Sequence, residues 1–180
     1  MPELILPDPR VQLSFLTAMK EFQAEGRGGA NDDHSMLGRE IKIWGHRWDE
    51  PAEFAAYTAW LRADVLEDSP RPPGFVPATT MWWADGHDYL GRITIRHRLT
   101  PSLLNLGGHI GYDVRPSARR RGHATLMLAA TLPVACGLGI DPVLITCDTG
   151  NVGSRKVIEA NGGVLEDERD GKLRFWAPTG

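Results

Sequence analysis

The stretch that decides the fold is Val114-Arg115-Pro116-Ser117-Ala118-Arg119-Arg120-Arg121-Gly122-His123-Ala124. A strand-like segment from Gly108 precedes it and an apolar, helix-like segment follows it, which predicts a turn between a strand and a helix. Four arginines lie between positions 115 and 121. The dipole at a helix start disfavours each of these cations by about 0.3–1 kcal/mol.

A bound anion would compensate these cations. A helix N-terminus offers free N–H groups, and a glycine such as Gly122 lets a phosphate approach the main chain closely. We therefore interpret the turn as a phosphate-binding site, the alternative being a solvated basic loop. The common nucleotide-binding patterns G-x-x-x-x-G-K-[ST] and G-x-G-x-x-G after a strand are absent.

The segments around this turn predict a sheet with helices packed on it. Apolar periodicity and turn residues predict helices over 8–25 and 49–66, three antiparallel-type strands over 78–84, 89–98 and 108–114, a helix over 122–136, a strand over 143–147, a helix from Asn151 to Asn161, and a hairpin of 164–168 and 173–176. The connection from the third to the fourth strand should be a right-handed crossover between parallel strands. The stretch 41–48 is aromatic-rich and shows no clean period.

The composition excludes several classes of protein. The chain has 180 residues, which suits one domain, and its formal net charge of −3 argues against a dedicated nucleic-acid binder. Two cysteines are too few for a disulfide framework or a zinc site. We interpret Asn31-Asp32-Asp33-His34 as a turn, and we expect no metal.

The sequence also indicates a cytoplasmic protein. The start, Met1-Pro2-Glu3-Leu4, does not resemble a signal peptide. The segment Ala124–Ile140 contains no charged residue, but Pro133 and Gly137 interrupt it. We interpret it as a buried core helix that ends near Gly137, and not as a membrane span.

The turn and its surroundings resemble a known family. Arg119-Arg120-Arg121-Gly122-His123-Ala124 matches the R/Q-x-x-G-x-G/A signature of the GNAT superfamily of acyl-CoA-dependent N-acyltransferases, and Val114 and Pro116 fit its preceding motif. Asn151-Val152-Gly153-Ser154 and Asn161-Gly162-Gly163 resemble the next element of that family. The resemblance covers roughly Ile93 to Val164. The whole chain resembles a bacterial branch of predicted acetyltransferases.

This resemblance implies the architecture. It implies an α+β fold with a central mixed, mostly antiparallel sheet of about six or seven strands and about four flanking helices, splayed between the third and fourth predicted strands. It implies a single acyl-CoA N-acyltransferase domain over 1–180. Residues 1–77 would form a helical part on the acceptor side, and residues 78–180 the sheet and the coenzyme-binding part.

The resemblance also implies acetyl-CoA as the co-substrate. The signature loop would bind the coenzyme A pyrophosphate, and the main chain of Tyr112 and Val114 would bind the pantetheine arm. Asn151 and Ser154 would either contact the coenzyme or cap and pack the following helix. The expected coenzyme-binding residues are Tyr112, Val114, Arg119, Arg120, Arg121, Gly122, His123, Ala124, Asn151 and Ser154.

Catalysis by direct transfer needs a proton acceptor for the amine and a proton donor for the leaving thiolate. Many family members use a tyrosine as the donor, but Ile158 occupies that position, so solvent or another group would serve. We predict His109 as the catalytic base, the alternative being a partly exposed strand histidine. His97 and Asp113 are weaker candidates, and Cys147 reads as a buried, inert thiol.

The predicted function is acetyl transfer to a primary amine of a small molecule or peptide. The alternative is a coenzyme A-binding sensor without catalysis. We expect no nucleic-acid or membrane partner and a monomer or homodimer. Some residues remain open: Arg96 and Arg98 would recognise an acidic acceptor or be solvated, the segment 44–48 would line the acceptor site or the core, and at most one of Trp82 and Trp83 should face the core.

Overall fold

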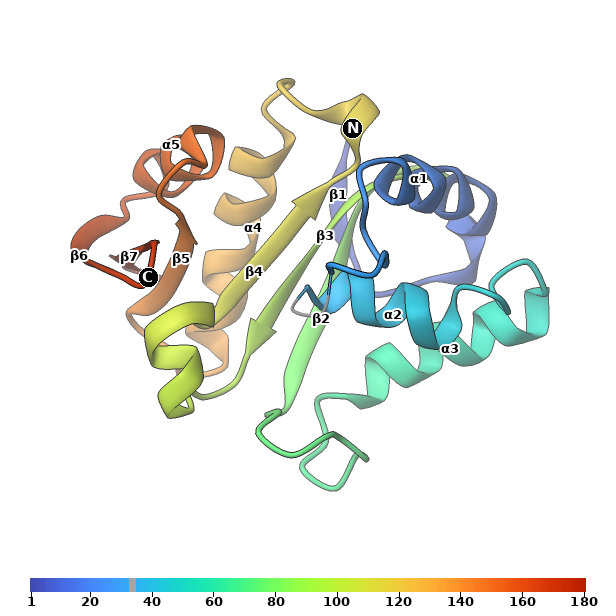
Figure 1. The fold of residues 1–180 in the computed structure, drawn as a ribbon, viewed down its shortest axis with the longest axis horizontal. Coiled ribbons are helices and arrows are strands. Elements are labelled where there is room, and N and C mark those ends of the chain that lie inside the picture. Colours follow the sequence, from blue (N-terminus) through green and yellow to red (C-terminus); the bar gives the residue numbers. More distant parts are fainter. Residues whose placement is uncertain (33–34) are drawn as a thin grey trace.

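The computed structural model describes residues 1–32 and 35–180, which form a mixed sheet with helices on both faces (Figure 1). The strand order is β1-β2-β3-β4-β5-β7-β6, with β1 (Glu3–Ile5), β2 (Ala78–Asp85), β3 (Asp88–Arg96), β4 (Ile110–Val114), β5 (Val143–Asp148), β6 (Val164–Arg169) and β7 (Lys172–Ala177). The α-helices are α1 (Gln12–Ala24), α2 (Met36–Trp44), α3 (Pro51–Ala63), α4 (His123–Gly137) and α5 (Val152–Ala160).

The predicted α+β architecture is confirmed. All neighbouring strands are antiparallel except β4 and β5, which are parallel and are joined through α4. In the described chain the pairing of β4 with β5 is confined to Ile110 opposite Ile145. The two strands therefore separate beyond this pair, which places the predicted splay at the C-terminal end of β4.

Helices cover both faces of the sheet and create two cores. α4 and α5 lie on one face, and α1, α2 and α3 lie on the other (Figure 1). Side chains alternate between faces along a strand, so Trp83 packs in the core under α4 while Trp82 packs against α1. The prediction that at most one of these tryptophans faces a core is wrong, because the sheet has a core on each side.

The helix α2 is not evident from the sequence because its buried side carries a charge. Ser35 caps it by accepting a hydrogen bond from the Gly38 N–H at 2.9 Å. Leu37 and Ile41 are buried at helical spacing, but Glu40 is buried beside them. A carboxylate on the core side breaks the apolar period that sequence analysis relies on. The three-residue β1 is too short to give a pattern.

The loop before α2 contains the acidic segment that we interpreted as a turn. Asp32 accepts hydrogen bonds from the N–H groups of Gly28 and Ser35, which is the role of a turn former. Asp33 and His34 lie outside the described residues. Across residues 1–32 and 35–180, no group of histidine, cysteine, aspartate and glutamate side chains is arranged to hold a metal ion.

The apolar helix α4 ends at Gly137, as the sequence predicts, but it is not buried all round. Met127, Leu128 and Ala135 are buried, whereas Leu126 is 56% exposed. One face of α4 packs on the sheet and the other faces outward. Among the described helices, none has the length and hydropathy needed to cross a bilayer.

Candidate active site

A cavity of about 700 Å³ lies at the C-terminal end of β4, between the arginine turn and the starts of α4 and α5. Nine of the ten residues predicted to bind the coenzyme line it: Tyr112, Val114, Arg119, Arg120, Gly122, His123, Ala124, Asn151 and Ser154. Arg121 is exposed outside this lining. The tertiary structure thus brings residues 112–124 together with residues 151–154.

Two of the four arginines are neutralised within the chain. Arg119 donates to both carboxylate oxygens of Glu25, at 2.6 and 2.8 Å. Arg115 donates to Glu21, with its Nε 3.1 Å from Oε1. Glu21 and Glu25 are one helical turn apart at the end of α1, so they face the turn together. The expectation that a bound anion must compensate all four arginines is therefore corrected.

The remaining part of the turn is suited to an anion. Gly122 has a φ of +81° and precedes α4 as its N-cap, without a side-chain hydrogen bond. A Cβ built on Gly122 meets no atom within 4 Å, so the space above its main chain is open. The first amides of α4 have no intrahelical acceptor, and within the described chain Arg120 and Arg121 form no ion pair. A polyphosphate fits these donors and cations.

A pair of hydroxyl groups faces the same cavity. The hydroxyl oxygens of Tyr112 on β4 and Ser154 on α5 are 2.6 Å apart. Asn151 holds Ser154 in position by accepting a hydrogen bond from its N–H at 3.0 Å, which is the capping role considered above. Burial raises the pKa of Tyr112 to about 12, so its hydroxyl remains protonated near neutral pH.

Ile158, at the position of the family's tyrosine, is fully buried in the core under α4. It therefore offers no polar group to the cavity. The sequence does not reveal the Tyr112–Ser154 hydroxyl pair because its members lie 42 residues apart. Only the packing of α5 against the splayed end of β4 shows that they meet.

Asp113 reaches the cavity from the opposite face of the sheet. It follows Tyr112 on β4, so its side chain points to the side of α1, and it pairs with Arg27 at 2.7 Å. Burial raises the pKa of Asp113, an effect that Arg27 opposes. Arg27, Asp113, Tyr112 and Ser154 all line one cavity, so residues from both faces of the sheet contribute to it at the splay.

His109 lies outside this cavity, at the other end of β4. Its ring Nδ1 accepts a hydrogen bond from the Leu144 N–H at 2.9 Å, and the main-chain N–H of His109 donates to the Leu144 carbonyl at 2.7 Å. The acceptor nitrogen of the neutral ring is therefore occupied. In this arrangement His109 links the starts of β4 and β5, and its catalytic role stays a prediction.

We expect His109→Ala to lower the unfolding free energy by about 1–3 kcal/mol, because the Leu144 N–H loses its acceptor. Burial, and then Arg96, lower the pKa of His109. This histidine therefore stabilises the fold above its ordinary pKa of about 6.5, and this stabilisation is lost as pH falls through the lower folded pKa. The unfolding free energy, measured with urea at about pH 7 and about pH 5, should therefore fall less between the two pH values in the variant than in the wild-type protein. Unchanged stability with lost turnover would instead support the catalytic role.

His97 and the segment 44–48 lie away from the cavity. His97 is hydrogen-bonded to the Thr79 hydroxyl at 2.8 Å, at the far end of β3. Trp48 is buried in the aromatic core, 5.0 Å from the Phe15 ring centre, whereas His46 is exposed. Cys147, by contrast, lies beside Ser154 of the cavity lining, and burial raises the pKa of its thiol, an effect that the hydrogen bond with Ser154 opposes. The segment 44–48 thus contributes to the core rather than to the cavity wall.

A family model described as an acetyltransferase (GNAT) domain matches residues 31–164. The match includes the arginine turn, β4, α4, β5 and α5. It therefore covers all the residues that line the cavity except Glu25 and Arg27. A search of curated protein sequences found no match.

Solved structures with the same fold are distant in sequence. RimJ of Mycobacterium smegmatis in complex with CoA-disulfide is 17% identical with a TM-score of 0.66, over 98% of this chain and 81% of that chain. The microcin C7 self-immunity acetyltransferase MccE, in complex with acetyl-CoA and AMP, is 13% identical with a TM-score of 0.62, over 98% and 92%. RimL, a ribosomal L7/L12 α-N-protein acetyltransferase, is 16% identical with a TM-score of 0.59, over 98% and 90%.

Proposed function

Since the chain belongs to the GNAT acetyltransferase family, we propose that it transfers an acetyl group from acetyl-CoA directly to a primary amine. The observation that carries the proposal is the single cavity lined by the signature turn, the Tyr112–Ser154 hydroxyl pair and Asp113. The coenzyme A complexes of RimJ and MccE support the choice of co-substrate. Residues 1–77 would then serve mainly the acceptor side, and residues 78–180 the coenzyme.

The arginine turn would hold the pyrophosphate of the coenzyme. The main chain at Gly122 and the first amides of α4 would donate to it, together with Arg120, a lining arginine without an ion pair in the described chain. Acetyl-CoA supplies an activated thioester. The splay beside Tyr112 and Val114 would receive the pantetheine arm, because strand edges there lack a partner strand.

Proton movement can be assigned to groups on the two faces of the sheet. We propose that the amine enters on the face of Asp113 and that this carboxylate takes up the amine proton. The Tyr112–Ser154 pair would donate a proton to the thiolate that leaves. Since Tyr112 has a pKa of about 12, this donor stays protonated across the neutral range. Positioning within one cavity supplies the rest of the rate enhancement.

Tyr112→Phe and Ser154→Ala should each lower kcat about ten- to a hundredfold. This is the lower end of the range for general acids, because a thiolate is a good leaving group and needs little help to leave. Thiol release under saturating acetyl-CoA measures the effect. Tyr89→Phe is the matched control, since the Tyr89 hydroxyl is buried outside the cavity without a partner in the described chain. A Tyr112→Phe enzyme with unchanged kcat would remove the pair from the mechanism.

A panel of amine acceptors with acetyl-CoA, read by free thiol release, tests the proposed function. RimL is described as an α-N-protein acetyltransferase, so peptides with a free α-amine are the first acceptors to try, followed by small amines. Release that depends on an acceptor supports the transferase. Coenzyme A binding without release for any amine would favour the sensor, the alternative that Ile158 raises. We expect a monomer or homodimer in the cytoplasm.

A further inference from the structure

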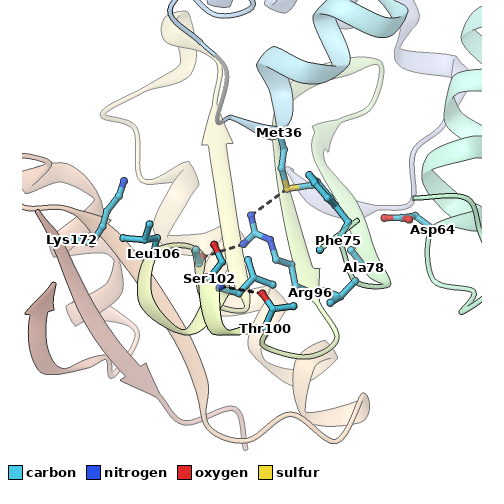
Figure 2. Close-up of a pocket in the computed structure, with 13 residues that line it drawn as sticks. Met36, Asp64, Phe75, Ala78, Arg96, Thr100, Ser102, Leu106 and Lys172 are labelled. Atoms are coloured by element: carbon cyan, nitrogen blue, oxygen red, sulfur yellow. Dashed lines mark hydrogen bonds between the residues drawn. The ribbon is translucent and has the colours of Figure 1, made fainter. Parts of the chain in front are cut away.

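A second cavity, of about 510 Å³, lies at the opposite end of β4 from the arginine turn (Figure 2). Its walls come from the start of α2, the loop before β2, the end of β3 and the turn before β4. The lining side chains include the apolar residues Met36, Phe75, Leu103 and Leu106. The side chain of Arg96 extends into the middle of this group (Figure 2).

Arg96 has no counter-ion among the described residues. Its Nη1 donates to the carbonyl oxygens of Gly107 and Gly108, at 3.1 and 3.2 Å, and its Nη2 donates to the Met36 sulfur at 3.3 Å. These bonds use three of the five N–H donors of a guanidinium, so two remain for a ligand. Burial, and then Arg92, lower the pKa of Arg96, and no carboxylate opposes this.

The other charged groups of the cavity are already paired. Asp64 accepts from Arg71 at 2.8 Å, and Figure 2 shows it on the far side of Phe75 from Arg96. Lys172 donates to Asp148 at 2.6 Å. Arg96 is therefore a half-buried cation without an ion pair in the described chain, set in an apolar cavity. A carboxylate that enters this cavity would gain a charge-assisted hydrogen bond of the stronger class.

The Arg96 guanidinium lies on the same face of the sheet as Asp113. A Cβ added to Gly111 would be 3.6 Å from Arg96 Nη2, so the guanidinium lies against β4 at Gly111, where a side chain is absent. Asp113 is two residues further along the same face of β4, at about 7 Å. A molecule that lay along this face would therefore need to span only a few bonds to place one group at Arg96 and another beside Asp113.

We propose that Arg96 binds a carboxylate of the acceptor, so that this protein prefers primary amines that carry a carboxylate a few bonds away. Peptides with an acidic first residue and free amino acids both combine a primary amine with a nearby carboxylate. The apolar walls suit a carbon spacer between amine and carboxylate, and the cation at the end selects its charge. This inference rests on the proposed acyl transfer for its reaction, but not for its binding.

The experiment compares acceptors that differ only in a carboxylate or an amide. One pair is a peptide that begins with glutamate and its glutamine counterpart, and the other is γ-aminobutyrate and its amide. We expect kcat/KM to be about ten- to a hundredfold higher for the carboxylate member, as loss of a charged hydrogen bond implies. The pair with the larger ratio distinguishes a peptide from a free amino acid as the acceptor.

Arg96→Gln should reduce this ratio to about one, whereas Arg96→Lys should retain part of it. Arg98→Gln is the matched control, because it makes the same charge change on an exposed residue that pairs with Glu67 outside the cavity. Leu106→Glu keeps the hydrogen bonds of Arg96 but adds a carboxylate to the cavity, so it should also lower the ratio. It covers the case in which Arg96→Gln does not fold.

Calorimetric binding of the two peptides to the protein saturated with coenzyme A separates this inference from the proposed function. If no amine is acetylated but the glutamate peptide binds more tightly in an Arg96-dependent way, the proposed function fails and the carboxylate site stands. Equal kcat/KM and equal binding for carboxylate and amide would overturn the site. A preference that survives Arg96→Gln and Leu106→Glu would overturn it as well.

Discussion

Acetyl-CoA should no longer protect the Gly122→Asp variant against thermal unfolding. In the wild-type protein, ligand at a hundred times its dissociation constant should add about 2.7 kcal/mol, which raises the melting temperature by roughly 5–10 °C for a domain of this size. The aspartate places a negative charge in the open space above the main chain, where the pyrophosphate would lie. We expect affinity to fall at least a hundredfold.

Gly122→Asn is the matched control for this prediction. Aspartate and asparagine at position 122 must both adopt the backbone φ of +81°. Both tolerate the left-handed region better than most residues, so the two variants carry similar backbone strain. They differ in charge and hardly in size. The asparagine variant should retain a measurable shift with acetyl-CoA. A full shift in Gly122→Asp would mean that the coenzyme phosphates bind elsewhere.

Arg92→Met should destabilise the fold by about 3–5 kcal/mol, the cost of breaking a buried ion pair. Arg92 donates to both carboxylate oxygens of Glu40, at 2.6 and 2.9 Å, and both residues are almost fully buried between β3 and α2. Tyr57 also donates to Glu40, at 2.5 Å. Without Arg92, a carboxylate stays in the core with one neutral donor, so equilibrium unfolding in urea should show a lower midpoint.

Two variants define the origin of this loss. Arg92→Met combined with Glu40→Leu removes both charges and should recover most of the stability, because a buried ion pair and an apolar pair differ little. Arg98→Met removes an exposed arginine from the same region and should cost about 1 kcal/mol or less. A loss below about 1 kcal/mol in Arg92→Met would show that the pair is not needed to hold α2 on the sheet.

The predictable part of this protein follows from local patterns. The segment 108–136 combines a strand, a Gly-containing basic turn and an apolar helix, and each part forms where the pattern indicates. Local geometry alone gives Gly122 its left-handed conformation and α4 its free N-terminal amides. The family resemblance of the same residues is confirmed by the match over residues 31–164.

The unpredicted parts depend on contacts between distant segments. Glu40 breaks the apolar pattern by which α2 could have been predicted. A carboxylate can be buried there only because Arg92, 52 residues away in sequence, pairs with it. Trp82 and Trp83 are both buried because a helical layer covers each face of the sheet. The charge of the turn was overestimated because Glu21 and Glu25 approach it from α1.

The sequence by itself therefore determined the fold family and the position of the proposed anion-binding turn, because both depend on residues adjacent along the chain. Only the tertiary structure decided which arginines remain free, that Tyr112 meets Ser154, that His109 is tied to Leu144, and that Arg96 occupies a cavity without a counter-ion. These are properties of charge balance and proton position. They depend on which groups lie within a few ångströms of one another. The sheet brings those groups together from segments that are tens of residues apart in the sequence.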